Sequence, residues 1–362
     1  MKSVLHKYKM GLNELEKFIE LQKIEKKLFS TIKKKEKEEQ KEQKEQKEEL
    51  YKSLEGLREF VSLYEGFSSK IVFDYNTIII SMYGYLEAFI EDLIKAYIST
   101  MRIYIRSFDN MPEKIKGNHS DLSALLIQNM KLPKYKDVTT VQNIIINMNS
   151  CVIRDESYQI NLDAYTHHTS NFRKGSIDEF FSKIGIENIS SLIQKHPKFK
   201  VYIEENDINI HNLFEIIDDL AERRNQVSHG SDGNVISSEI LLGYLKYFYV
   251  YGEVLYSILN MEVIKYRIEK DNELIKLGDS IAIFGNDIVC FSIYKLCIKT
   301  GFDIYAKTNN DSEPIRYGKI ISIRVNNRDV NEVQAENNDI EISLKVDFKV
   351  NKKYEYYMSR AN

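Results

Sequence analysis

Apolar residues near the N-terminus recur at steps of three and four, the spacing that places side chains on one face of a helix. They occupy positions Leu12, Leu15, Phe18, Leu21, Ile24, Leu28 and Ile32, and a similar pattern resumes over residues 50–64. Residues 33–49 contain no apolar side chain, but their Lys and Glu residues fall three or four apart, as in a solvated helix. One helix through roughly 50 residues would be about 75 Å long. We therefore expect residues 1–66 to form a long charged helical arm, either simply solvated or a platform for a partner or for RNA.

A second helix is predicted over residues 70–104, and it is hydrophobic on nearly every side. A helix of that kind lies at the centre of a core. Glu87 lies inside this apolar segment. Since a buried carboxylate needs a partner, we expect an arginine from elsewhere in the chain to meet it.

Residues 105–265 alternate helical patterns with polar loops. The helices that matter most are expected over 209–229, closed by Gly230 as a C-terminal cap, and over 237–265. Residues 67–268 are therefore expected to form one helical domain.

The pattern changes at about residue 268, where β signals begin. Strands are predicted at 280–284, 288–294, 302–306, 319–325, 340–350 and 354–358, with Gly- and Asn-rich turns between them. Several short strands within about 90 residues are typical of a small closed barrel. The expected fold is thus mainly α: a helical bundle with a long charged N-terminal helix, followed by a small C-terminal β-barrel domain over residues 269–362.

Composition narrows the class of protein. The 362 residues carry a net charge of −3, so nucleic acid would have to be bound by a local patch. The three cysteines, Cys151, Cys290 and Cys297, have no CxxC spacing, which argues against a disulfide framework. The N-terminal residues lack the apolar region of a secretion signal, and no apolar run reaches membrane-spanning length. We expect a cytoplasmic protein that makes no membrane contact.

The predicted helix 209–229 ends in the run Arg223-Arg224-Asn225-Gln226-Val227-Ser228-His229-Gly230. Arg224 falls on the apolar stripe of this helix, where a guanidinium is costly unless it is paired or lines a cavity. Arg223 has Asp219 four residues earlier, a favourable helical pair, whereas Arg224 has Leu220 at that position. Arg224 is therefore the arginine left to meet a phosphate or a distant carboxylate.

Asn225 and His229 are four residues apart and share a face of the helix. His229 lies in the last turn, where the negative end of the helix dipole favours a protonated ring. Arg224 and His229 are about 140° apart on an ideal helix. The length of the arginine, or a distorted last turn, would have to bring them together.

These residue types suit the cleavage of RNA, which carries its own nucleophile, the 2′-hydroxyl. Histidine transfers protons near neutral pH, and arginine matches the phosphate oxygens with a permanent charge. Asn225 can hold the imidazole or an oxygen. The expected product ends in a 2′,3′-cyclic phosphate, and neither a metal nor another cofactor is expected. The alternative reading of the motif is a helix end with a satisfied arginine and a capping histidine.

His167 and His168 form the other conspicuous group, with Asp163 four residues before His167. Nearby residues do not complete a zinc site, so these positions read as a polar loop or as a supporting part of an RNA cleft. Cys151 reads as a small core residue.

The run from Leu220 to Gly230 resembles the signature of the HEPN superfamily, an Arg, a polar residue, a short spacer and a His. The segment Ser81–Leu93 resembles the early core helix of its RiboL-PSP-HEPN branch. Thr169–Arg173, followed by Phe180–Ile186, resembles the middle portion of that branch. These stretches cover roughly residues 67–265 in the matching order. The charged residues 33–49 depart from the shorter pattern expected there.

The resemblance implies a helical bundle that forms a homodimer around the motif helix, with two motifs facing one cleft. It also implies metal-independent RNA cleavage, within a toxin–antitoxin or anti-phage system that supplies an antitoxin or defence partner. Arg224 and His229 carry over as catalytic and Asn225 as supporting, while Glu87 or Glu91 carries over more loosely as an orienter of Arg224. Arg223 is expected to support the site, and the expected partner is RNA, with tRNA as one candidate.

The C-terminal strands, including 276–284, 318–323 and 340–345, are similar to the β-barrel domain II of translation GTPases. That resemblance implies docking to tRNA or the translation machinery, and the alternative is an ordinary small barrel that serves as an interaction module. For the whole chain the alternative function is a non-catalytic HEPN-like adaptor. Such an adaptor would bind protein partners through the arm and the barrel, and Arg224 would form a structural ion pair with Glu87 or Glu91.

Overall fold

The computed structural model describes residues 1–39, 55–135, 138–153, 157–230, 234–271, 274–308 and 315–359. The chain divides into two compact units. The first combines Met1–Ser99 with Pro112–Ile258, and the second combines Thr100–Met111 with Leu259–Asn362. The expected fold class is confirmed, because helices dominate the first unit and a curled antiparallel sheet dominates the second.

Three long helices form the framework of the first unit: α1 (Lys2–Glu39), α4 (Lys70–Tyr104) and α12 (Ser238–Lys270). The last residues of α4, from Thr100, and of α12, from Leu259, belong to the second unit. The Tyr8 ring of α1 stacks on Phe89 of α4 with centroids 4.1 Å apart. The same tyrosine lies against Gly252 of α12, where a Cβ would come within 2.6 Å of its ring. The close approach of α1 to α12 therefore requires glycine at this position.

The central position predicted for residues 70–104 is confirmed. Ten apolar side chains of α4 are at most 1% exposed: Ile78, Ile79, Met82, Leu86, Ile90, Leu93, Ile94, Tyr97, Ile98 and Met101. At about 25 cal/mol per Å² of buried apolar surface, each such side chain contributes roughly 1.5–3 kcal/mol. Polar residues on the same helix are thus held by a rigid element.

The N-terminal arm does not continue as one straight helix through residue 64. The Phe29 ring of α1 stacks on Tyr64 of α3 (Glu55–Gly66) at 4.6 Å, and Lys33 pairs with Glu65. In a single helix, residues 29 and 64 would be about 50 Å apart. The chain therefore reverses between α1 and α3, and the charged run that was expected to bridge them lies mostly outside the described residues.

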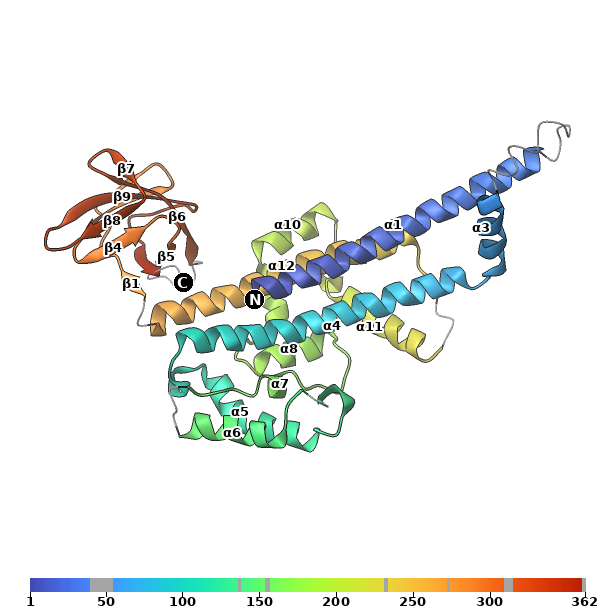
Figure 1. Cartoon of the computed structure of the whole chain (residues 1–362), viewed down its shortest axis with the longest axis horizontal. Helices are drawn as coiled ribbons and strands as arrows, with labels where there is room; N and C mark the ends of the chain where they lie inside the picture. Colours follow the sequence, from blue (N-terminus) through green and yellow to red (C-terminus); the bar gives the residue numbers. More distant parts are fainter. Residues whose placement is uncertain are drawn as a thin grey trace. The chain divides into compact units, whose positions relative to one another are not determined.

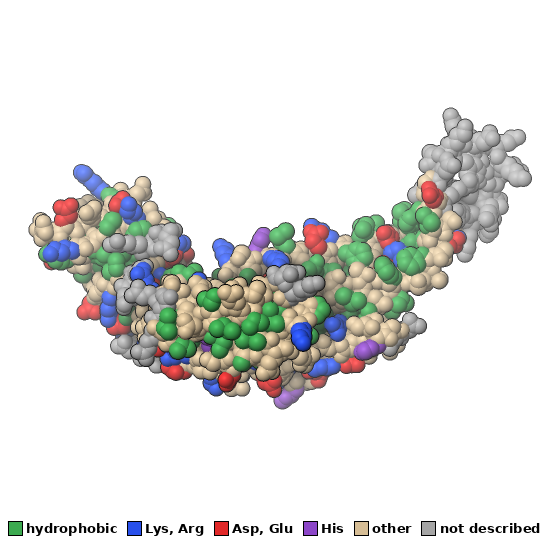
Figure 2. Space-filling model, turned by 60° about the horizontal axis from the view of Figure 1, so that its bottom comes forward, with side chains coloured by type: hydrophobic (Ala, Val, Ile, Leu, Met, Phe, Trp, Pro, Cys, Tyr) green, Lys and Arg blue, Asp and Glu red, His purple; other side chains and the backbone are tan. Residues whose placement is uncertain are grey.

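Apolar side chains remain exposed along this arm, as Figure 2 shows in green beside the grey atoms. In the arm, Ile24 of α1 is 62% exposed and Leu63 of α3 is 67% exposed. Among the described residues, no helix is both long and apolar enough to cross a membrane.

Shorter helices complete the first unit, several of them on one side of α4 (Figure 1). They are α5 (Glu113–Gln128), α6 (Val141–Val152), α7 (Leu162–Tyr165), α8 (Lys174–Ser182), α9 (Ile189–Lys195), α10 (Pro197–Glu205) and α11 (Glu215–Ser228), with 3₁₀ turns at Pro133–Tyr135 and Ile210–Asn212. The helix that carries the Arg-Asn-x-x-x-His motif is α11. Gly230 follows it with a φ of 69°, the left-handed conformation that closes a helix, as the sequence predicts.

The second unit contains a curled antiparallel sheet with the strand order β1-β10-β5-β6-β9-β3-β2, to which β7 adds beside β6, and a separate β4-β8 pair. The strands are β1 (Ile275–Lys276), β2 (Ala282–Phe284), β3 (Ile288–Ile293), β4 (Leu296–Lys299), β5 (Asp303–Lys307), β6 (Arg316–Val325), β7 (Arg328–Val330), β8 (Glu332–Ala335), β9 (Ile340–Val346) and β10 (Glu355–Ser359). Its core includes Phe291, Ile304, Ile323, Leu344 and Tyr356, all fully buried. Within the described strands, β1 and β2 remain edges, so the expected closed barrel is a half-barrel.

Candidate functional site

The motif helix α11 buries one face and presents the motif at its C-terminal end. Ile217 and Leu220 are at most 1% exposed, which confirms the predicted apolar stripe. Arg224, one turn beyond Leu220, is half-buried, and His229 is exposed just past the last turn. The helix stays regular through Ser228, and the His229 amide donates to the carbonyl of Asn225 at 3.0 Å. The described backbone therefore contains no distortion that would reduce the angle between Arg224 and His229.

The two neighbouring arginines have different surroundings. Arg223 donates from Nε to Asp219 at 2.6 Å and from one terminal nitrogen to Tyr75 and to the carbonyl of Asn234, at 2.9 and 3.0 Å. The predicted helical pair with Asp219 is thus formed. Through these contacts Arg223 holds α11 to α4 and to the segment that precedes α12.

Arg224 makes two weak contacts. Its guanidinium carbon lies 5.3 Å from the centroid of the Tyr83 ring, and one terminal nitrogen is 3.4 Å from Oδ1 of Asn225. Within the part of the chain that the structure describes, no carboxylate is within ion-pair distance of Arg224. Its positive charge is therefore available to an anion.

Asn225 is held by the loop that joins α7 to α8. Its Oδ1 accepts a hydrogen bond from Nδ2 of Asn171 at 2.6 Å. In the same loop the Phe172 amide donates to the Tyr83 hydroxyl at 2.8 Å. The pKa of Tyr83 is raised to about 12 by burial, so its ring stays neutral beneath Arg224. The loop thus fixes both the support of Arg224 and the orientation of Asn225.

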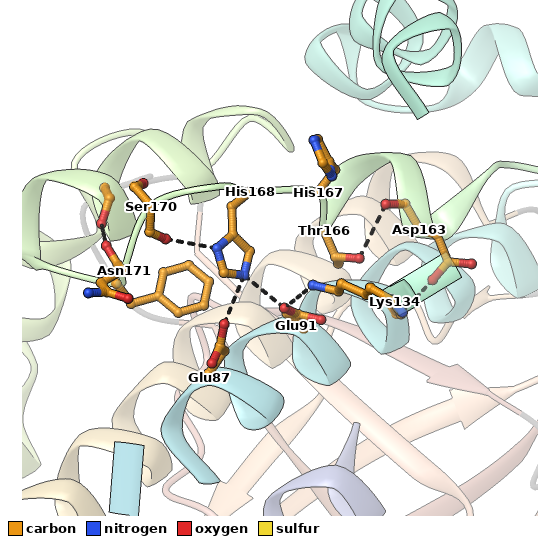
Figure 3. A network of polar contacts seen from close by, with 12 residues as sticks. Glu87, Glu91, Lys134, Asp163, Thr166, His167, His168, Ser170 and Asn171 are labelled. Atoms are coloured by element: carbon orange, nitrogen blue, oxygen red, sulfur yellow. Dashed lines mark hydrogen bonds and ion pairs between the residues drawn. The ribbon is translucent and has the colours of Figure 1, made fainter. Parts of the chain in front are cut away.

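Glu87 and Glu91 follow Tyr83 at successive turns of α4, but they meet a histidine. Nε2 of His168 lies 2.8 Å from Oε1 of Glu91 and 3.3 Å from Oε1 of Glu87, and Figure 3 shows the imidazole directed at both carboxylates. Lys134 also donates to Glu91, at 2.5 Å. Burial alone would raise the pKa of Glu91, but its hydrogen bonds with His168 and Lys134 outweigh burial and lower it. Among the described residues, neither glutamate forms the expected ion pair with Arg224.

The grouping around His168 was not recognisable from the sequence. Asp163, considered there as a partner of His167, instead accepts from Lys95 at 2.5 Å. His167 itself lies 2.6 Å from the Tyr135 hydroxyl, which leaves only His168 facing the carboxylates. Seventy-seven residues separate His168 from Glu91, so no local spacing could indicate the contact.

Cys151, expected in the core, is buried there, and burial raises the pKa of its thiol to about 11. A pocket of about 660 Å³ lies away from the motif, between α1, α10 and α12, and is lined by residues that include Glu16, Tyr202 and Lys246. It contains none of the motif residues, so we base the candidate site on the Arg224 surroundings and not on the pocket.

Comparison with known proteins gives one family. The family model described as RiboL-PSP-HEPN matches residues 19–261. The match begins within α1, so it includes the charged run that the sequence pattern alone placed outside the family resemblance. No curated protein matches the chain.

Proposed function

Because the chain belongs to the RiboL-PSP-HEPN family, we propose that it is a metal-independent endoribonuclease that cleaves RNA by attack of the substrate's own 2′-hydroxyl. The observation that supports this most is the state of Arg224, a half-buried arginine at a helix end without a carboxylate partner among the described residues. Such a guanidinium fits a phosphate, whose oxygens its planar donors match.

In the proposed reaction the 2′-oxygen bonds to phosphorus and the bond from phosphorus to the 5′-oxygen breaks. The products are a 2′,3′-cyclic phosphate and a free 5′-hydroxyl. Arg224 stabilises the charge on the phosphoryl oxygens, and His229 transfers protons between the 2′-hydroxyl and the leaving oxygen. Asn225, oriented by Asn171, supports a substrate oxygen or the imidazole.

A homodimer through α11 completes this proposal. Arg224 and His229 are about 140° apart on a regular helix, so one copy does not direct both side chains at the same point. His229 is exposed and close to the end of α11, where a second α11 would bring another His229 into the same cleft. One histidine would then accept the 2′-hydroxyl proton while the other protonates the 5′-oxygen.

We also propose a biological setting for the enzyme, a cytoplasmic toxin or anti-phage effector with an antitoxin or defence partner. Transfer RNA is the substrate to test first. These proposals rest on the family alone.

The test is cleavage of tRNA and of synthetic RNA by the purified chain in EDTA, with the ends of the products identified. Wild-type protein should give 2′,3′-cyclic phosphate ends, and His229→Ala should not cleave. His211→Ala is the matched control, because His211 is also exposed but lies outside the motif. If wild type leaves every RNA intact, with and without its activating partner, the proposal fails.

The adaptor alternative draws support from the exposed apolar side chains of the arm, including Ile24 and Leu63. It also expected an ion pair between Arg224 and Glu87 or Glu91, which the described residues do not form. Expression in cells separates the two readings. The adaptor is favoured if wild type and His229→Ala are equally harmless to the cells while Arg224→Ala unfolds.

A further inference from the structure

Glu87, Glu91 and His168 bring three metal-ligating atoms within 4.8 Å of one another. Two of the side chains come from successive turns of α4, and the third comes from the loop before α8, as Figure 3 shows. The side chains of Glu91 and His168 are each 12% exposed and that of Glu87 is 33% exposed. The cluster is thus shielded from bulk water but reachable by an ion.

The hydrogen bond on the far side of the imidazole indicates how the ring is protonated. Nδ1 of His168 is 2.9 Å from the carbonyl oxygen of Ser170. A carbonyl only accepts, so Nδ1 carries a proton. Nε2 is therefore the nitrogen that faces the two carboxylates, and a histidine that binds a metal ion through one nitrogen is oriented in this way by the hydrogen bond of the other.

The distance from Nε2 to Glu87 suits a shared metal ion, whereas the distance to Glu91 is that of a direct hydrogen bond and would lengthen when an ion binds. Ligand atoms that share a zinc ion at about 2.1 Å lie about 3.0 Å apart at a right angle and about 3.4 Å apart at the tetrahedral angle. Nε2 lies 2.8 Å from Glu91 and 3.3 Å from Glu87. The bond from Nδ1 to Ser170 is also the outer contact that commonly orients a metal-binding histidine.

We infer that Glu87, Glu91 and His168 form a binding site for a divalent transition-metal ion, with zinc as the expected occupant. Three protein ligands leave a fourth position for water. The ion would fasten the loop before α8 to α4. Because Asn171 in that loop holds Asn225, it would stabilise the neighbouring motif. The proposed cleavage chemistry does not pass through this ion, because none of its three ligands belongs to the Arg-Asn-x-x-x-His motif.

Lys134 contacts one of the proposed ligands and so offers a direct test. Its Nζ donates to the same oxygen of Glu91 that faces His168. A cation and the lysine would compete for that oxygen, and removal of the lysine also removes a repelling charge. Lys134→Met should therefore bind zinc more tightly than wild type, whereas a simple structural role for the cluster predicts no gain.

The experiment is titration of the full chain with Zn²⁺ after treatment with chelator, followed by calorimetry and equilibrium dialysis. Wild type should bind one ion at this site. Substitution of outer contacts commonly costs about 10–100-fold in affinity, so loss of a ligand in His168→Ala or Glu87→Gln should cost at least about tenfold. His211→Ala, an exposed histidine elsewhere, is the control and should bind as wild type does.

Glu87→Gln is the ligand variant that should disturb the fold least, because Glu87 is the most exposed of the three side chains. Its circular dichroism and its thermal midpoint without metal should match those of wild type. Co²⁺ should give a visible band that is lost in His168→Ala. The inference is overturned if wild type binds no zinc, if His168→Ala and Glu87→Gln bind it as tightly as wild type, or if Lys134→Met binds it no more tightly. None of these outcomes depends on RNA cleavage.

Discussion

Replacing each of the two adjacent arginines by methionine should separate stability from activity. Arg223 makes three hydrogen bonds at 2.6 to 3.0 Å, one of them to the Asp219 carboxylate. Its side chain is 18% exposed and that of Asp219 is 39% exposed. Solvent screening therefore reduces the value of the pair towards the low end of the 1.5–3 kcal/mol typical of charged hydrogen bonds. With the two neutral partners included, Arg223→Met should lower the free energy of unfolding by about 2 kcal/mol.

Arg224→Met removes much less from the fold. A 3.4 Å contact to Asn225 contributes little, and a cation–π contact with Tyr83 is worth roughly 0.5–1 kcal/mol. The free energy of unfolding should therefore fall by less than about 1 kcal/mol. The rate of RNA cleavage, however, should fall by about 10²–10³-fold, the usual cost of losing one donor to a developing charge.

Both quantities can be measured on the same preparations, by urea unfolding followed with circular dichroism and by single-turnover cleavage of a labelled RNA. Arg224→Lys is the control for charge without the planar fork, and it should recover only part of the rate. The reasoning is refuted if Arg224→Met is the less stable variant, or if Arg223→Met abolishes cleavage while Arg224→Met retains it.

Three further predictions concern the scaffold. His119 is 2% exposed, and burial lowers its pKa to about 4 from 6.5. The free energy of unfolding therefore has its full value above pH 6.5 and falls as pH drops towards 4, because the unfolded chain binds a proton at this histidine and the folded chain does not. Urea unfolding should therefore show wild type losing about 2 kcal/mol relative to His119→Gln between pH 7 and pH 5, and a constant difference would contradict this. Gly252→Ala places a Cβ against the Tyr8 ring. Although alanine has the better helix propensity, overpacking should lower the free energy of unfolding by about 1–3 kcal/mol, which a lower thermal midpoint would show. In the second unit, Arg267→Met removes the ion pair with the buried Asp271 carboxylate and the hydrogen bond to the Tyr305 hydroxyl. It should destabilise that unit by about 2 kcal/mol in urea unfolding, unlike the exposed Arg324→Met.

The features that the sequence predicts correctly depend on local patterns. The central helix α4 has the expected bounds, and Gly230 has the positive φ of a helix cap because glycine alone adopts it without cost. The pair between Asp219 and Arg223 follows from their spacing on one helix. The strands β1, β4, β7 and β8, of two to four residues each, were not predicted, because so short a run shows no clear alternation.

Features that depend on long-range packing could not be predicted. The reversal from α1 to α3 is one, since the charged run between them contains neither glycine nor proline and reads as continuous helix. The pairing of Glu87 and Glu91 with His168 is another. The pattern predicts that Glu87 needs a partner, with an arginine as the candidate, and the residue that meets it is a histidine from a distant loop. A single helix face indicates that a buried acid needs a partner, while the path of the chain decides which residue supplies it.

That change of partner bears directly on how Arg224 can act. Tyr83, Glu87 and Glu91 lie on one stripe of α4, and Arg224 lies over the first of them. Burial keeps Tyr83 neutral by raising its pKa to about 12. The first charged residue of the stripe is Glu87, which lies against His168. Glu91, one turn further along, contacts both His168 and Lys134. If either glutamate instead paired with Arg224, a phosphate would have to displace a carboxylate before it could bind. Because His168 of the loop before α8 meets both acids, Arg224 has no such competitor among the described residues. We therefore expect this loop, as well as the motif helix, to control whether the motif can bind an anion.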